Sequence, residues 1–298
     1  MTESYYLCFD IGGTNVKYGV LNALGSFVTQ GHYSTNKSSK KTFIQDITNK
    51  VNEITSTYAI KRIGISFPGF INVDTGYAEF AGAIDVLHGE NILALLYENI
   101  TLPIVIENDA NCATLAEKLT GNAKDCDDFI CMTIGTGIGG GIFINGKLVN
   151  GHTFKAGEFG LMIIDGMVNG YKNMHEIAST SALIHTYKEA KGLNESEKVE
   201  GDQVFREALE DRQVKRLLDQ WFSYVSFGIF NLAATLNPEK ILIGGGISVR
   251  EDLYEMLEEA LLAIPSWQDI RCTIEPCKHH NEAGMIGALY KCIEEENQ

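Results

Sequence analysis

Phe9-Asp10-Ile11-Gly12-Gly13-Thr14 and Thr133-Ile134-Gly135-Thr136-Gly137-Ile138 are two segments of one pattern, and this pattern decides the fold. In each segment a short β-prone run ends in glycine and threonine, and a second β-prone run follows, which predicts a β-hairpin with a tight turn. Two hairpins of the same kind in one chain indicate a duplicated domain. A length of 298 residues also suits two domains, so we expect two lobes with a cleft between them.

A change of pattern near residue 120 separates the two lobes. Before it, apolar residues recur at three- and four-residue steps between Phe43 and Tyr58, as an amphipathic helix requires. The polar stretch Thr120 to Asp128 then interrupts the pattern, and the second hairpin segment follows. We place the lobes at residues 1–118 and 119–298.

The second lobe is predicted to be mostly helical. Helices are expected from Phe205 to Leu218 and from Trp221 to Leu236, and a strand from Lys240 to Ile243 precedes Gly244-Gly245-Gly246. The last helix, at about residues 282–296, carries apolar residues along one side and therefore needs a surface to pack on. We expect it to pack back on the first lobe.

Composition and charge narrow the class of protein. Hydrophobic residues make up 45% and charged residues 21% of the chain, which is close to the average of folded globular proteins. The formal net charge of -15 disfavours polyanionic partners, so no nucleic acid is expected. A nucleotide is still compatible with this charge, because local backbone N–H groups and a metal ion decide phosphate binding.

The cysteines and the apolar runs predict a cytoplasmic location. The seven cysteines are scattered and several lie in apolar runs, as expected of reduced core residues. The start of the sequence lacks the pattern of an export signal. The longest uncharged stretch, Phe129 to Ile144, is rich in glycine and shorter than the roughly 20 apolar residues of a membrane span. We therefore expect no membrane association.

Both hairpin turns are suited to phosphate. In the first, Asp10 ends a strand, Gly12 and Gly13 let phosphate oxygens approach backbone N–H groups, and Thr14 adds a hydroxyl donor. A plain β-turn with no ligand would need the same glycines. The second turn formally matches G-x-G-x-x-G, but a strand rather than a helix follows it, which argues against a dinucleotide site, and no P-loop motif is present. Two such turns facing each other would hold a triphosphate from both sides.

Carboxylates suited to sugar chemistry lie elsewhere in the chain. Glu107-Asn108-Asp109 stands at a strand-to-helix junction, where ligand-facing groups of α/β folds usually lie, although Asn108 or Asp109 could simply cap the helix. A carboxylate here could accept the proton of a sugar hydroxyl as that hydroxyl attacks the γ-phosphate of ATP. Glu158 lies between glycines and could bind sugar hydroxyls, or could be a solvated turn residue.

These motifs together resemble the ROK family, named for repressors, open reading frames and kinases, over nearly the whole chain. The resemblance implies an α/β protein with the duplicated actin-like ATPase (ribonuclease H-like) fold, an ATP-dependent sugar kinase that uses Mg²⁺, and a homodimer. Family repressors carry a DNA-binding domain before this core, for which the sequence shown leaves no room. The segments that carry the resemblance are Asp10 to Thr14, Pro68-Gly69, Glu107 to Asn111, Gly135 to Gly140, Ala156 to Gly160, Gly244 to Gly246 and Glu282-Ala283-Gly284 with Gly287-Ala288.

The resemblance also implies roles for individual residues. Asp109 is expected to be the catalytic base, and Asp10 is expected near Mg²⁺ through a water. The sugar ligands are expected to be Gly69, Asn108, Glu158 and, by a weaker match, Glu176. The residues expected around ATP are Asp10, Gly12, Gly13, Thr14, Lys17, Thr136, Gly137, Gly244 and Gly245, with the last two near the nucleoside.

One departure from the family pattern bears on metal and substrate. Most members have a zinc site built from a histidine after the A-G-E-x-G motif and a cysteine cluster, whereas Leu161 stands at the histidine position and Asp165 to Glu176 contains no cysteine. No zinc is therefore predicted, and His152 and His175 are expected in surface or packing roles. The pattern looks most like the zinc-free bacterial β-glucoside kinases, which act on the 6-hydroxyl of cellobiose-like disaccharides.

Other functions stay open on the sequence. Glucokinase and N-acetylmannosamine kinase would differ only in contacts near C1 and C2 of the sugar. A sugar-sensing regulator without phosphotransfer is a non-enzyme alternative, but it would need no base at Asp109. A glycoside hydrolase that pairs Asp109 with Glu158 would leave both glycine turns unexplained.

Overall fold

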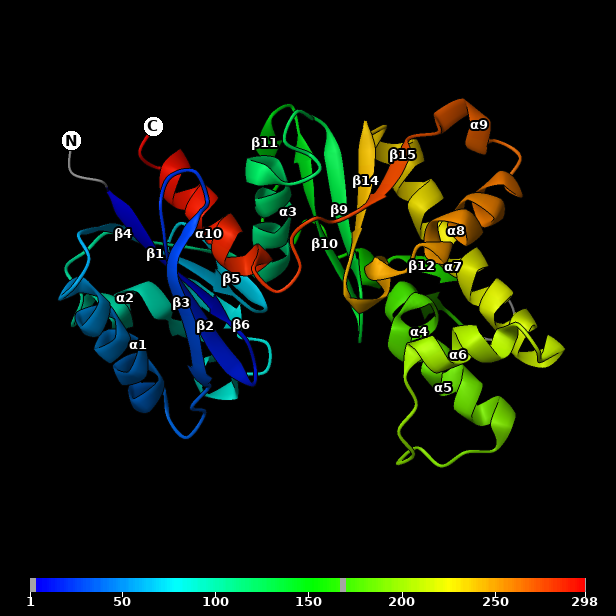
Figure 1. The fold of residues 1–298 in the computed structure, drawn as a ribbon, viewed down its shortest axis with the longest axis horizontal. Coiled ribbons are helices and arrows are strands. Elements are labelled where there is room, and N and C mark those ends of the chain that lie inside the picture. Colours follow the sequence, from blue (N-terminus) through cyan, green and yellow to red (C-terminus); the bar gives the residue numbers. More distant parts are fainter. Residues whose placement is uncertain (1–3, 167–169, 298) are drawn as a thin grey trace. The chain divides into compact units, whose positions relative to one another are not determined.

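The computed structural model describes residues 4–166 and 170–297 and divides the chain into two compact units (Figure 1). Unit 1 consists of Met1–Asp125, Leu148–Ala156 and Lys278–Gln298, and unit 2 of Cys126–Lys147 and Gly157–Cys277. The division first falls after Asp125, a few residues beyond the predicted boundary at 118. Unit 1 is thus assembled from three separate parts of the sequence.

A five-stranded sheet forms the centre of unit 1, in the order β3-β2-β1-β4-β8. The first three strands pair antiparallel, and β1, β4 and β8 pair parallel. The predicted first hairpin is confirmed as β1 and β2, with Ile11 opposite Val16. The strands are β1 Tyr5–Ile11, β2 Asn15–Leu21, β3 Phe27–Ser34, β4 Ile60–Phe67 and β8 Ile104–Asn108.

Unit 2 is built on a sheet with the same plan, in the order β11-β10-β9-β14-β15. Strands β9 and β10 form the predicted second hairpin, and β14 pairs parallel with β9 and with β15. Since hairpin and parallel strands repeat in one order in both units, the duplication expected from the two glycine segments is confirmed, in the pattern of the actin-like ATPase fold. The strands are β9 Phe129–Ile134, β10 Ile138–Ile144, β11 Lys147–Leu148, β14 Lys240–Gly244 and β15 Thr273–Pro276.

Helices cover the sheet of unit 1. In Figure 1 the last helix, α10 (red), lies beside α3 and the strands β1 and β4. The contact is close because it runs through glycine: a Cβ at Gly287 would overlap the backbone of Cys112, and one at Gly64 would lie 2.6 Å from the carbonyl oxygen of Ala288. The helices of unit 1 are α1 Lys40–Thr55, α2 Ile92–Tyr97, α3 Asp109–Thr120 and α10 Ala283–Glu294.

A small three-stranded antiparallel sheet, β5-β6-β7, adds to unit 1 a part that the sequence patterns did not reveal. Its strands are too short for a clear alternation of polar and apolar residues. The elements here are β5 Phe70–Asn72, β6 Tyr77–Phe80, η1 Asp85–Leu87 and β7 Glu90–Asn91.

Unit 2 carries most of the helices, and one predicted boundary there is wrong. The helix expected to break between Leu218 and Trp221 is continuous as α7, and the break lies earlier, after Ala208. Asp211 decides the new start, because its side chain accepts hydrogen bonds from the N–H groups of Gln213 and Val214. The helices are α4 Met174–Ala178, α5 Thr180–Lys191, α6 Gly201–Ala208, α7 Arg212–Leu236, α8 Asp252–Leu262 and α9 Trp267–Ile270, with short 3-10 turns η2 Phe159–Leu161 and η3 Gly246–Val249, and a two-stranded ribbon of β12 Ile163–Asp165 and β13 Lys172–Asn173.

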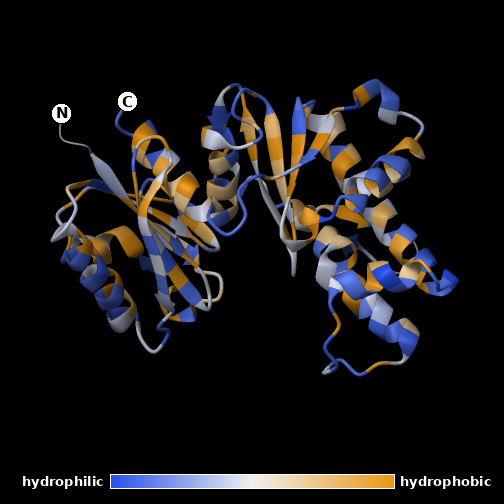
Figure 2. Cartoon of the chain, in the orientation of Figure 1, coloured by the Kyte–Doolittle hydropathy of each residue, from blue (hydrophilic) through white to orange (hydrophobic). Residues whose placement is uncertain are grey.

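Each unit has a hydrophobic core of its own. Figure 2 shows that the central strands of both sheets are largely hydrophobic. Leu7 and Phe9 on β1 are fully buried in unit 1, and Ile130 and Met132 on β9 are fully buried in unit 2. Because the cores come from equivalent strands of the two sheets, the repeated hairpins also organise the two cores.

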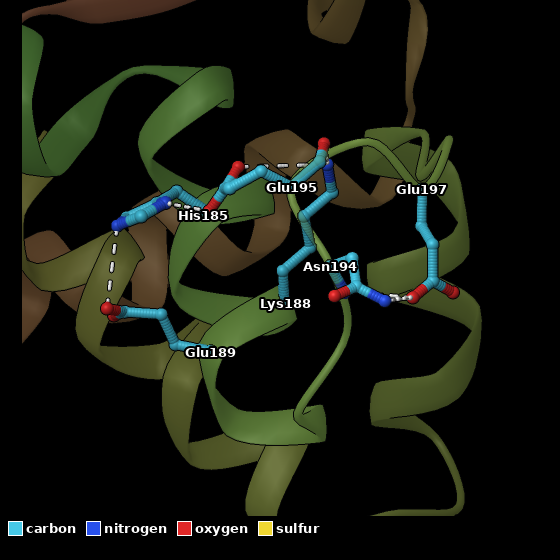
Figure 3. Close-up of polar contacts among 6 residues, drawn as sticks. All are labelled: His185, Lys188, Glu189, Asn194, Glu195 and Glu197. Carbon is cyan, nitrogen blue, oxygen red and sulfur yellow. Dashed lines mark hydrogen bonds and ion pairs between the residues drawn. The ribbon is translucent and has the colours of Figure 1, made fainter.

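The turn after α5 is held by ion pairs and hydrogen bonds on the surface of unit 2 (Figure 3). Gly192 ends the helix with φ +65°, and His185 on α5 lies 2.9 Å from Glu195 and 3.6 Å from Glu189. Lys188 donates to the carbonyl oxygen of Glu195 at 2.7 Å. These contacts fix the path of the chain as it leaves α5.

Among the helices of the described residues, none combines the length and the apolar character that a membrane span requires.

Candidate active site

The first glycine turn presents Asp10 at the carboxyl end of β1. One oxygen of Asp10 accepts a hydrogen bond from the hydroxyl of Ser66 at 2.9 Å, and the other lies 3.3 Å from the ammonium group of Lys17. Lys17 also donates to the carbonyl oxygen of Asn281 at 3.0 Å. The carboxylate is therefore half-buried and held in place from two sides.

The turn itself is tight and has little space around it. Gly12 N–H donates to Asn15 O at 3.0 Å, and the hydroxyl of Thr35 donates to Gly12 O at 2.6 Å. A Cβ at Gly13 would lie only 2.8 Å from the Cβ of Ala83. Thr14 is exposed at the tip. A small residue is thus needed at Gly13 for packing, and this holds whether or not phosphate binds there.

The sheet brings the predicted catalytic segment to the same edge as Asp10, with one strand between them. Strand register places Asp10 beside Ser66, and Ser66 beside Glu107, across β1, β4 and β8. Parallel strands end at one edge of the sheet, so the residue after β8, Asp109, begins α3 at the edge that also carries Asp10. This alignment is a consequence of topology, since the residues are about a hundred positions apart in sequence.

Asp109 is exposed and is oriented by local hydrogen bonds. One of its carboxylate oxygens accepts from Ala110 N–H at 2.9 Å and from the side-chain amide of Asn108 at 3.1 Å. Asn108 caps α3, because its side-chain oxygen accepts from the N–H groups of Ala110 and Asn111. The capping alternative considered for Asn108 is therefore real, and it leaves Asp109 as an accessible carboxylate at a helix N-terminus.

Asn108 also connects this segment to the turn after β4. Its side-chain amide donates to the carbonyl oxygen of Gly69 at 2.9 Å. Gly69 has φ +90°, and a Cβ there would overlap the carbonyl oxygen of Phe80. Two residues expected to bind sugar, Asn108 and Gly69, are thus in direct contact, next to Asp109.

Glu107 lies beneath these residues and is almost fully buried, with 1% of its surface exposed. Its Oε1 accepts from Asn108 N–H and from the side chain of Asn111, both at 2.9 Å. Burial raises the pKa of the Glu107 carboxyl, and the hydrogen bonds from Asn111 and Asn108 lower it by less. The contacts give Glu107 a role in holding the β8–α3 junction.

In unit 2 the second glycine turn is held by a histidine that was expected only in a surface or packing role. His175 on α4 accepts a hydrogen bond at Nδ1 from Ile138 N–H at 3.0 Å. Its ring packs against two glycines, since a Cβ at Gly160 would overlap it and one at Gly137 would lie 3.1 Å from Nδ1. Because Nδ1 accepts, the neutral ring must carry its proton on Nε2. Because Ile138 and His175 are 37 positions apart in the sequence, no sequence pattern predicts this contact.

Glu158 lies near the same histidine. It is half-buried at the start of η2, and burial raises the pKa of its carboxyl. Gly157 before it has φ +89°, and a Cβ there would lie within about 2.5 Å of the Gly140 carbonyl oxygen in the second hairpin. Glu158 is therefore fixed against the hairpin that contains Thr136 and Gly137.

Glu176 has a structural function in the described residues. It forms a capping box with Asn173: Glu176 N–H donates to the Asn173 side chain at 3.1 Å, and Asn173 N–H donates to a Glu176 carboxylate oxygen at 3.0 Å. The sugar contact expected of Glu176 stays a prediction.

A cavity of about 360 Å³ opens beside the second turn, wholly within unit 2. Gly135 and Thr136 line one part of it, Gly246 follows the predicted nucleoside residues Gly244 and Gly245, and Phe205 and Arg250 come from more distant segments. Gly245 has φ +88°, and a Cβ there would overlap the carbonyl oxygen of Ile134. The cavity thus combines residues that the sequence motifs singled out with an aromatic ring and a cation that they did not.

Among the described residues, side chains that could bind a metal ion do not gather at one place. Over residues 4–166 and 170–297 no group of three or more His, Cys, Asp or Glu side chains is arranged to hold a metal ion. Part of the segment that carries the cysteine cluster in zinc-bearing relatives, residues 167–169, lies outside the described residues. The expected absence of zinc stays a prediction.

The sequence matches the model of the ROK family over residues 6–295. It is 36% identical over 294 residues to a β-glucoside kinase of Listeria monocytogenes, covering 97% of this chain and 98% of that protein. A β-glucoside kinase of Klebsiella pneumoniae is 34% identical over 286 residues, covering 95% of this chain and 94% of that protein.

Solved structures agree with these matches. Lmo2764 of Listeria monocytogenes, described as a candidate N-acetylmannosamine kinase, superposes with a TM-score of 0.89 at 35% identity and covers 98% of this chain and all of that one. A ROK family glucokinase of Streptomyces griseus in complex with glucose and AMPPNP has a TM-score of 0.73 at 25% identity, covering 96% of this chain and 98% of that one.

Proposed function

The chain belongs to the ROK family and is an ATP-dependent sugar kinase, and from this premise we propose that it transfers the γ-phosphate of ATP to the 6-hydroxyl of a β-glucoside, with Asp109 as general base. The observation that carries the proposal is the Asn108–Asp109 pair at the start of α3. Its carboxylate is exposed to a substrate, and local hydrogen bonds orient it. A general base needs both properties.

The proton step follows from this geometry. As the 6-hydroxyl oxygen forms its bond to phosphorus and the bond from phosphorus to the leaving ADP oxygen breaks, Asp109 accepts the hydroxyl proton. Asn108 and Gly69 would hold the sugar in position, because their mutual hydrogen bond of 2.9 Å fixes both beside Asp109. Glu158 would accept hydrogen bonds from other sugar hydroxyls.

The two glycine turns and the cavity of unit 2 support an ATP site. Backbone N–H groups at Gly13 and Gly137 are suited to phosphate oxygens. The N–H of Gly12 is already bound to Asn15 O within the turn, so Gly12 would contribute only its lack of a side chain. The cavity lined by Thr136, Gly246 and Phe205 has a mostly apolar wall and a volume of about 360 Å³, which suits a nucleoside. Gly246 lines this cavity, and a Cβ there would meet no atom within 4 Å, so the backbone at this point is open to a ligand.

Magnesium would be held on the side of unit 1. Asp10 is a half-buried carboxylate beside the first turn, and carboxylate oxygens are ligands that Mg²⁺ prefers, so Asp10 would hold the ion through a water. When bound, Mg²⁺ neutralises charge on the transferred phosphate. Asp10 also has a structural partner in Ser66, so its substitution would disturb the sheet edge as well.

The preference for a β-glucoside rests on the relatives and on Leu161. Two relatives at 36% and 34% identity are β-glucoside kinases. Leu161 is exposed after Glu158, where zinc-bearing members have a histidine, and an apolar residue there suits a substrate extended beyond C1. We also propose that the protein works without zinc, as a cytoplasmic homodimer.

Coupled measurement of ADP release tests the substrate. With cellobiose, glucose and N-acetylmannosamine at matched concentrations, kcat/KM should be highest for cellobiose. N-Acetylmannosamine is included because Lmo2764, whose structure matches with a TM-score of 0.89, is described as a candidate kinase for this sugar. Equal turnover of all three sugars would defeat the β-glucoside assignment and leave the kinase class intact.

Replacement of Asp109 tests the mechanism. Asp109→Asn should lower kcat by roughly 10² to 10⁴, the usual contribution of a general base, because the amide cannot accept the hydroxyl proton. Calorimetric binding of the sugar should change little, which separates the base from a binding role. Unchanged phosphorylation by Asp109→Asn would exclude the assigned role, and disaccharide cleavage without ATP would point to a hydrolase.

A further inference from the structure

An exposed aromatic cluster on the small sheet of unit 1 has no role in the mechanism above. Phe80 at the end of β6 keeps 45% of its surface exposed, although it is a large apolar side chain. Its ring lies 4.9 Å from the ring of His88 and 5.8 Å from that of Phe70, measured between centroids. We call Phe70, Phe80 and His88 the aromatic shelf. Exposed apolar side chains that cluster are candidates for a binding surface, in contrast to those scattered singly.

The shelf is supported by polar groups rather than buried by apolar ones. Lys155 lies 5.0 Å from the centroid of the Phe70 ring and forms an ion pair with Glu79 at 2.7 Å. The Nε2 atom of His88 is 3.3 Å from the carbonyl oxygen of Gly82. These contacts place hydrogen-bonding groups next to an aromatic surface, and ligand sites combine the same two kinds of group.

The loop that carries Phe80 is continuous with the candidate active site. Gly69 packs against the Phe80 carbonyl oxygen, and Gly69 itself accepts the hydrogen bond from Asn108. Two residues further along, a Cβ at Gly82 would lie 2.9 Å from Pro68, and Ala83 packs against Gly13 in the first turn. The shelf is thus attached both to the Asn108–Asp109 pair and to the predicted phosphate turn, all within unit 1.

The chemistry of a β-linked glucose ring fits such a surface. Its substituents are equatorial, so each face of the ring presents C–H groups that pack flat on an aromatic ring. Its hydroxyls point outward from the rim, where Lys155 and Glu79 can pair with them. A free glucose already bound at Asp109 has no second ring to use the shelf, so the shelf would act only on an extended substrate.

We propose that the aromatic shelf is the subsite for the second ring of a β-glucoside whose first ring is phosphorylated at Asp109. The proposal rests on the proposed function, and it adds the residues that recognise the substituent at C1. Phe80 supplies the stacking face, His88 and Phe70 hold its ring, and the Lys155–Glu79 pair faces the hydroxyls of the second ring.

The test compares Phe80→Ala with the wild type by calorimetric binding without ATP and by ADP release. The ligands are cellobiose, methyl β-glucoside and glucose. Loss of one stacking ring should raise Kd and KM for cellobiose roughly three- to tenfold. Methyl β-glucoside has the β-linkage without a second ring and should follow glucose, whose constants should stay within about twofold. Phe80→Trp should restore cellobiose binding.

Tyr77→Ala is the matched control. Tyr77 lies on the same strand and is 46% exposed, against 45% for Phe80, and it has no ring contact with the shelf among the described residues. It should leave the cellobiose-to-glucose ratio unchanged, and thermal melting should show both variants folded.

The outcomes separate this proposal from the proposed function. A Phe80→Ala variant that changes the constants for all three ligands alike, or for none, overturns the shelf. Glucose phosphorylation without any cellobiose binding also overturns the shelf but leaves the kinase standing. Binding of cellobiose that depends on Phe80, with no phosphorylation of any sugar, would support the shelf and reject the phosphotransfer at Asp109.

Discussion

His175 is the residue whose role changes most between sequence and structure. Its Nδ1 atom accepts the Ile138 N–H at 3.0 Å, and its ring occupies the space left open by Gly137 and Gly160. It therefore holds the second glycine turn without belonging to that turn. We regard it as a positioning residue for the backbone that we propose to bind phosphate.

Substitution of His175 should separate packing from hydrogen bonding. In His175→Leu the Ile138 N–H loses its acceptor, and an unsatisfied backbone donor costs about 1–3 kcal/mol, so KM for ATP should rise by roughly fivefold or more while KM for the sugar changes less. His175→Asn places an oxygen acceptor near the Nδ1 position and should recover most of the loss. Steady-state kinetics with each substrate varied in turn makes the comparison, and equal defects in both variants would contradict it.

Glu158 leads to a prediction on pH. Burial raises the pKa of its carboxyl above the ordinary value, so the carboxylate takes up a proton at a higher pH than an exposed glutamate does. If its charged form binds sugar hydroxyls, kcat/KM for the sugar should decline as pH falls through this raised pKa and stay high above it. Glu158→Gln should bind sugar more weakly but lack this acid limb. An unchanged limb in the variant would assign it to another group.

At the scale of elements, the contact between α10 and α3 determines how the last segment joins unit 1. Gly287 lets the two helices approach, because a Cβ there would overlap the backbone of Cys112. Helix propensity alone would favour alanine at this position by about 1 kcal/mol. The observed glycine therefore indicates that close packing outweighs propensity.

Gly287→Ala should accordingly lower the free energy of unfolding by roughly 1–3 kcal/mol, as overpacked cores do. Urea unfolding followed by circular dichroism measures it. Gly246→Ala is the control, since a Cβ there meets no atom within 4 Å, and its free energy of unfolding should differ from wild type by under about 0.5 kcal/mol. If Gly287→Ala leaves the free energy of unfolding unchanged, α10 shifts on α3 without loss of stability.

Apolar periodicity and helix capping predict different features of the helices. Apolar periodicity found α1 and α10, and the capping residues Asn108 and Asp211 mark helix starts in the structure. The predicted helix break near residue 220 is wrong, because α7 stays amphipathic across this position. The helix begins after the capping residue Asp211. At this boundary the capping side chain of Asp211 predicts the start of the helix better than apolar periodicity does.

For the whole molecule, the net charge of -15 leads to a prediction on stability. Repulsion among 39 acidic groups against 24 basic ones disfavours the compact state, and salt screens it with a Debye length of about 10 Å at 0.1 M. The melting temperature should therefore rise between 10 and about 200 mM NaCl, which calorimetry can follow. Choline chloride at equal ionic strength should have the same effect. A melting temperature that falls over this range would show that ion pairs outweigh the repulsion.

Features that depend on neighbouring residues could be predicted from the amino-acid sequence. Two glycine turns between β-prone runs predicted both hairpins and the duplication, and the Asn108–Asp109 junction predicted a strand end followed by a helix start. These signals are local, because turn geometry, capping and side-chain periodicity act within a few residues.

Contacts between distant residues became known from the folded chain alone. The alignment of Asp10, Ser66 and Glu107 follows from the order of parallel strands, the contact of His175 with Ile138 joins a helix to a turn, and the aromatic shelf depends on a small sheet of short strands. No pattern along the chain predicts such contacts. The residues that form them lie far apart in the sequence, and they are stabilised by packing between segments that meet only in the folded chain.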